Sequence, residues 1–185
     1  RQSIWRDAFQ ELGLDPAQAE LLPPARQYEI LSKGLRDTFG LALVEKSKPA
    51  NIRDSIDQLL DAYRNLQFMA HVLDLPAKAI GLDGKLALGM TSQGKFLGAY
   101  FPLGTKGSRD AEGLNTQTPT IILPGRSNSF AHEWGHALDY FIVDKYQGAV
   151  DNLSGMVRNG ESLSDQFPET VRDSFRLLMN AIFFD

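Results

Sequence analysis

The sequence predicts an α+β fold in which helices pack on a small, mostly antiparallel sheet. Apolar residues recur at three- and four-residue spacing over most of the chain, which is the period of helices with one buried face. Short runs of strand-forming residues replace this period only between residues 86 and 123. With 185 residues, 43% of them hydrophobic, the chain is long enough to bury a sizeable core.

Helices are expected over most of the first 73 residues. Apolar periodicity and proline positions predict helices at 3–12, 16–22, 27–39 and 51–73. We therefore expect an N-terminal helical lead segment over 1–50, followed by one domain over 51–185. A further amphipathic helix is predicted at 167–183.

Strands are expected in the middle of the chain, at 86–90, 95–101 and 118–123. Gly94 ends a turn that favours a hairpin between the first two. Pro119, near the start of the third, suits an edge strand. The long polar segment 102–116 is either a substrate-side flap or a mobile insertion.

The most informative pattern is His-Glu-x-x-His, formed by His132, Glu133 and His136. Residues four apart on a helix lie one turn apart on the same face, so both histidines can reach one metal ion. Glu133 lies next to them around the helix, where it can contact a metal-bound water. Two nitrogen ligands, an open coordination position and a general base are the parts of a helical zinc site in metallopeptidases. The chain has no cysteine, so Zn2+ has to be held by nitrogen and oxygen alone.

The helix that carries this motif is expected to have two different faces. Apolar side chains gather on one side, at Phe130, Ala131, Trp134, Ala137, Leu138, Phe141 and Ile142. The opposite side carries His132, His136, Asp139 and Val143. Gly135 lowers helix stability by roughly 1 kcal/mol relative to alanine, which suggests that another backbone packs closely against it.

Residues 130–139 (Phe-Ala-His-Glu-Trp-Gly-His-Ala-Leu-Asp) resemble the motif of the first large polyvalent protein-associated domain. Residues 79–89 resemble the strand region of the same family, and the likeness covers roughly 50–180. The resemblance implies a zincin-like fold and zinc-dependent hydrolysis of peptide bonds. It also implies that the chain is part of a larger phage or mobile-element protein, located in the host cytoplasm or carried by the phage.

Catalytic zinc sites usually have three protein ligands, and the third is the open question. Asp139 shares the histidine face but lies about 10 Å along the helix axis from His132, at a rise of 1.5 Å per residue. We therefore expect Asp139 to orient His136, to form an ion pair, or to be a plain surface residue. Glu161 and Asp165 resemble the Glu-x-x-x-Asp element of thermolysin-like zincins. That resemblance implies that Glu161 binds zinc and that Asp165 hydrogen-bonds a histidine ligand.

Composition argues against two other classes of partner. A net charge of −4 without a basic stretch disfavours nucleic acid as a partner. The chain contains no apolar run of 18 residues, so no membrane span is predicted.

No targeting signal is visible, and because the chain begins with Arg1 we expect a fragment. The predicted function is a zinc metallopeptidase that takes a peptide or protein substrate along the strand near 120–123. The alternative is a non-catalytic zincin-like module with a structural or docking role.

We expect Glu161→Ala to weaken zinc binding at least tenfold, about 1.4 kcal/mol, because the ion loses one of three protein ligands. Competition with a chromophoric zinc chelator measures this affinity. Unchanged affinity would move the third ligand to Asp139, to a residue beyond Asp185, or to water.

Overall fold

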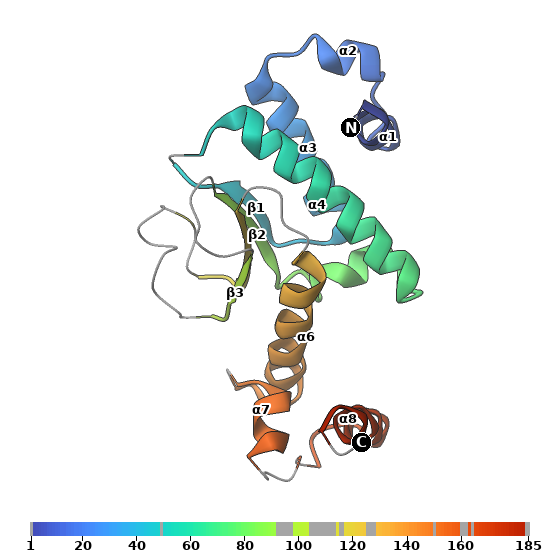
Figure 1. Ribbon diagram of the computed structural model, residues 1–185, viewed down its shortest axis with the longest axis vertical. Coiled ribbons are helices and arrows are strands. Elements are labelled where there is room, and N and C mark those ends of the chain that lie inside the picture. The colour runs from blue at the N-terminus through green and yellow to red at the C-terminus, as the bar shows by residue number, and fades with distance from the viewer. Residues whose placement is uncertain are drawn as a thin grey trace. The chain divides into compact units, whose positions relative to one another are not determined.

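The computed structural model describes residues 2–48, 50–91, 98–103, 114, 117–124, 129–149, 151–159, 163 and 165–183 (Figure 1). The chain divides into two compact units, Arg1–Ala137 and Leu138–Asp185. The predicted division after residue 50 does not coincide with this one. Strand β1 (Leu43–Lys46), which precedes that point, belongs to the same sheet as strand β2 (Ala87–Thr91).

The helices of the first unit lie close to where the sequence predicts them. They are α1 (Gln2–Glu11), α2 (Pro16–Glu20), α3 (Pro24–Phe39), α4 (Ile52–Val72) and the 3-10 helix η1 (Ala77–Gly81). Local chemistry fixes their ends. The side chain of Asn51 accepts a hydrogen bond from the Arg53 N–H at 2.8 Å and so caps α4. Gly40 ends α3 at a φ of 65°, a left-handed conformation that glycine adopts without strain.

The sheet has four strands in the order β1-β2-β4-β3, where β3 is Ala99–Phe101 and β4 is Thr120–Pro124. The α+β class is confirmed, but the prediction of a mostly antiparallel sheet is wrong. Strands β1, β2 and β4 run parallel, and only β3 pairs antiparallel with β4. The physical reason is α4, which lies between β1 and β2 in the chain and returns it to the same end of the sheet.

Strand β4 is an internal strand, so both the predicted edge at 118–123 and the predicted hairpin are wrong. β4 lies between β2 and β3, which keeps those two strands apart. The run Ile121–Ile122–Leu123 is buried on both faces, which is typical of a central strand. Pro119 precedes the strand, where its missing N–H interrupts no strand pairing. Its carbonyl accepts a hydrogen bond of 2.8 Å from the Ala87 N–H.

The core of the first unit lies where α3 and α4 pack on each other and on the sheet (Figure 1). Its fully buried side chains include Leu31, Leu35, Leu59, Leu66, Leu88 and Met90. Gly89 leaves room for another segment: a β-carbon there would lie 3.2 Å from Cδ1 of buried Leu114. Leu114 is the only described residue of the predicted flap between 104 and 116, and the rest lies outside the described residues.

Trp134 attaches the motif-bearing helix α6 (Phe130–Gln147) to the rest of the first unit. Its indole Nε1 donates a hydrogen bond of 2.9 Å to the carbonyl of Ile80 in η1, and both groups are buried. Phe130 and Ala137 are buried as predicted, whereas Ala131 is exposed. One face of the first half of α6 is therefore fixed against the turn that follows α4.

The second unit contains the last part of α6, then α7 (Leu153–Arg158) and α8 (Glu169–Phe183). Its core consists of Val143, Leu153, Met156 and Phe167. Val143, which the periodicity places on the side opposite the predicted core face, is buried. The reason is that this part of α6 has different neighbours and buries a different face. No helix in the described part of the chain is long and apolar enough to cross a membrane.

We expect Trp134→Phe to lower the free energy of unfolding by about 1–3 kcal/mol, because the buried Ile80 carbonyl loses this donor. Tyr28→Phe is the matched control. The Tyr28 hydroxyl is buried without a hydrogen-bond partner among the described residues. Burial, followed by the charge of Glu45, raises the pKa of Tyr28. Removing that hydroxyl should leave stability unchanged or slightly higher, and equal losses in both variants by chemical denaturation would contradict this interpretation.

Candidate metal centre

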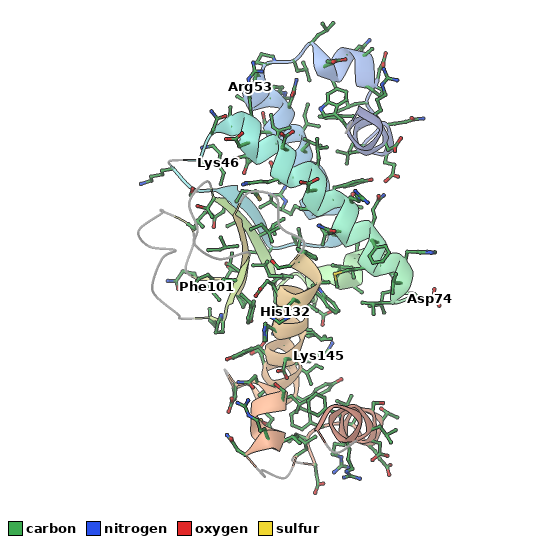
Figure 2. The ribbon with its side chains drawn as sticks, in the orientation of Figure 1. Lys46, Arg53, Asp74, Phe101, His132 and Lys145 are labelled. Carbon is green, nitrogen blue, oxygen red and sulfur yellow. The ribbon has the colours of Figure 1, made fainter. Side chains whose placement is uncertain are left out.

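His132, labelled in Figure 2, lies on the exposed side of α6. His136 lies beside it, as the four-residue spacing predicts. Their Nε2 atoms are 3.1 Å apart. The ring centroids are 4.7 Å apart, and the ring planes are perpendicular. The two Nε2 atoms are thus within hydrogen-bond distance of each other, so the helix brings the same nitrogen of both imidazoles together.

This geometry fits a metal ion. Two nitrogen ligands about 2.0–2.1 Å from a tetrahedral zinc ion lie roughly 3.3 Å apart. The observed separation of 3.1 Å is close to that value. Two neutral imidazoles this close cannot both direct an N–H at each other, so at least one Nε2 presents its lone pair. The pair has the donor type and the spacing of two zinc ligands.

Glu133 occupies the first turn of the same helix but is nearly buried, with 7% of its surface exposed. Its backbone N–H donates to the Ser129 carbonyl at 3.0 Å, which fixes the start of α6. The positive end of the helix dipole favours a carboxylate in this turn. A carboxylate with little freedom of movement thus follows His132 directly in the chain.

Gly98 lies against this first turn, a contact that the sequence did not predict. A β-carbon at Gly98 would lie 2.2 Å from Oγ of Ser129 and 3.2 Å from Cγ of Glu133. Gly98 directly precedes β3, so β3 begins beside the motif. A glycine inside the predicted strand 95–101 was the available signal, because such a glycine often marks a close approach of another group.

Of the three residues proposed as further ligands or supports, Asp139 and Asp165 are placed by the structure and have other partners. Glu161 lies outside the described residues. Asp139 accepts hydrogen bonds from the Ser154 N–H, at 2.9 Å, and from the Ser154 hydroxyl, so it holds α7 against α6. Asp165 is fully exposed and accepts from Nη1 of Arg172 at 2.6 Å. Its hydrogen bond to a histidine ligand stays a prediction.

Two further observations bear on the surroundings of the histidine pair. Across the described ranges, no group of three or more His, Cys, Asp or Glu residues is placed to hold a metal ion. Gly135 is exposed, and no described atom lies within 4 Å of where its β-carbon would be. The predicted close packing of a backbone on Gly135 is therefore not found among the described residues.

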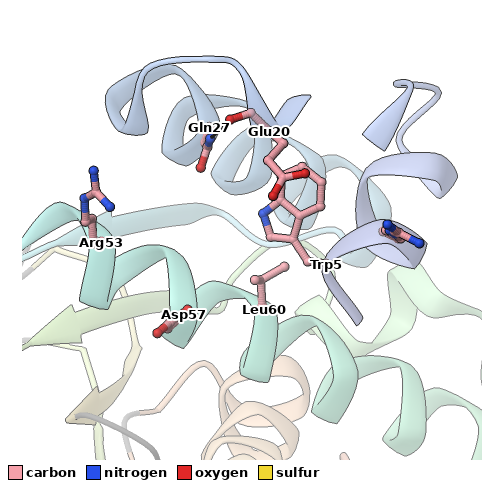
Figure 3. A pocket seen from close by; sticks show the side chains of 7 residues that line it. Trp5, Glu20, Gln27, Arg53, Asp57 and Leu60 are labelled. Carbon is pink, nitrogen blue, oxygen red and sulfur yellow. Dashed lines mark hydrogen bonds between the residues drawn. The ribbon is translucent and has the colours of Figure 1, made fainter. Parts of the chain in front are cut away.

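A separate cavity of about 340 Å³ opens between α1, α2, α3 and α4 (Figure 3). Trp5 and Leu60 supply its apolar surface. Its charged lining residues are Arg6, Glu20, Arg53 and Asp57. The lining thus has two basic and two acidic side chains, and this balance favours neither an anionic nor a cationic ligand. No residue of the histidine motif lines this cavity.

Comparisons with models of protein families, with curated proteins and with solved structures find no match to this chain.

Asp139→Ala tests whether this carboxylate supports the fold or the metal. We expect it to lower the free energy of unfolding by about 1–3 kcal/mol, because the Ser154 N–H and hydroxyl lose their acceptor. Zinc affinity should change less than twofold. Ser154→Ala is the matched control, since it removes the hydroxyl bond but keeps the carboxylate. A tenfold loss of zinc affinity in Asp139→Ala alone, with stability unchanged, would instead make Asp139 part of the metal centre.

Proposed function

We propose that this chain is a zinc-dependent metallopeptidase. The observation that carries the proposal is the convergence of the His132 and His136 Nε2 atoms to 3.1 Å on the exposed side of α6. Glu133, the residue between them that can act as a base, belongs to the same helical turn. Two convergent nitrogen donors and an adjacent carboxylate are the protein groups that metal-assisted hydrolysis requires.

Each residue has one role in this proposal. His132 and His136 bind zinc through Nε2. When bound, zinc acidifies a coordinated water and polarises the substrate carbonyl. Glu133 accepts the proton of the attacking water and delivers it to the leaving amine nitrogen. Burial of Glu133 restricts its carboxylate to few orientations, which favours proton transfer along a fixed direction.

We also propose that the chain belongs to the first large polyvalent protein-associated domain family and adopts its zincin-like fold. Two segments resemble that family, and the structure brings them into contact. The Trp134 indole of segment 130–139 donates to the Ile80 carbonyl of segment 79–89. The proposed setting is a larger protein of a phage or mobile element.

Metal content tests the proposal against its alternative, a non-catalytic structural or docking module. The purified chain, dialysed against trace zinc, should retain about one zinc per chain. The double variant His132→Ala/His136→Ala should retain none above background. Substoichiometric zinc in the parent, equal to that in the double variant, would favour the non-catalytic module.

Glu133→Gln separates catalysis from metal binding. We expect the variant to keep its fold and its zinc content, because glutamine has nearly the same shape and the histidines are unchanged. Hydrolysis should fall by about 10² to 10⁴, the range that general base catalysis contributes. Cleavage of a fluorogenic peptide library by both proteins measures this. Equal rates would remove Glu133 from the mechanism.

A further inference from the structure

We propose that Gly98 is a positioning residue for Glu133: the missing side chain lets the Gly98 backbone pack directly on the first turn of α6 and fix the Glu133 side chain. Only the expected loss of hydrolysis rests on the proposed function. The contact itself is a property of the structure and is testable without any substrate.

Distances from a β-carbon placed at Gly98 show how closely this residue approaches Ser129 and Glu133. A β-carbon at Gly98 would lie 2.2 Å from Oγ of Ser129, a distance that two such atoms do not adopt. It would lie 3.3 Å from Cβ of Ser129 and 3.2 Å from Cγ of Glu133. The hydroxyl of Ser129 is therefore the nearest obstacle, and it would have to rotate away or shift. Cγ of Glu133 would need to yield by only a few tenths of an ångström.

Both neighbours belong to the start of the same helix. Ser129 accepts the Glu133 N–H through its carbonyl, so a displaced Ser129 also disturbs the residue after His132. Glu133 has little free space, because only 7% of its surface is exposed. A shift at Cγ therefore passes to the carboxylate. A misplacement of about 1 Å in a catalytic group can lower a rate roughly 100-fold.

The histidine pair provides an internal reference. His132 and His136 lie on the exposed side of α6, whereas the Gly98 contact involves Ser129 and the buried Glu133. Substituting Gly98 should therefore disturb the base and leave the metal-binding nitrogens in place. This separation distinguishes a positioning residue from one that merely stabilises the fold.

The experiment compares the full chain with Gly98→Ala, Ser129→Ala and the double variant. Ser129→Ala removes the nearest obstacle, so the double variant should accommodate the new β-carbon. Gly34→Ala is the matched control: a β-carbon there would lie 2.4 Å from Cδ2 of Leu12, a comparable collision in α3. Three properties are measured: the ¹³C NMR signal of the Glu133 carboxylate, zinc affinity, and hydrolysis of a fluorogenic peptide library.

We expect Gly98→Ala to shift the Glu133 signal and to lower hydrolysis at least tenfold, with zinc affinity changed less than twofold. Adding Gly98→Ala to Ser129→Ala should have a smaller effect than Gly98→Ala has in the parent chain. Both the shift of the Glu133 signal and the loss of hydrolysis should be at most half as large. Gly34→Ala should leave the Glu133 signal in place. An unmoved Glu133 signal in Gly98→Ala, or purely additive effects in the double variant, would overturn the inference. If the parent cleaves nothing, the proposed function fails, and the NMR signal and zinc affinity still decide the role of Gly98.

Discussion

The hydrogen bond from Trp134 to the Ile80 carbonyl is the interaction on which the candidate site depends. Trp134 lies inside the His-Glu-x-x-His motif, so this one bond sets the rotation of α6 about its own axis. With the indole turned inward, the two histidines on the other side of the helix remain exposed. Glu133, on the flank, then lies against Gly98, directly before β3. A neutral hydrogen bond typically contributes about 1 kcal/mol, but a buried carbonyl left without its donor is more costly.

What the sequence could predict was local. The convergence of His132 and His136 follows from four-residue spacing on one helix and needs no knowledge of the fold. The ends of α3 and α4 were predictable for the same reason, because Gly40 and Asn51 act on backbone groups a few residues away. Each of these features depends on atoms within one or two helical turns.

What the sequence could not predict depends on distant partners. Strand order follows from which runs bury both faces, and β4 is central because Ile121, Ile122 and Leu123 are all buried. Proximity along the chain favoured a β2–β3 hairpin instead. The contact of Gly98 with Ser129 and Glu133 joins residues that the register of the sheet brings together. Helical period and turn composition contain no information about such a pairing.

Helix α6 shows how far periodicity extends as a guide to function. Its period places Asp139 and Val143 with the histidines, yet Val143 is buried in the core of the second unit and Asp139 binds Ser154. A helical face keeps one role only while its neighbours stay the same, and these change along α6. Asp139 is engaged at α7, and its distance along the axis from His132 is already too great for a shared ion. In the proposed metal centre, α6 would supply the two nitrogens and the base, and Asp139 would serve the contact with α7 instead of the ion.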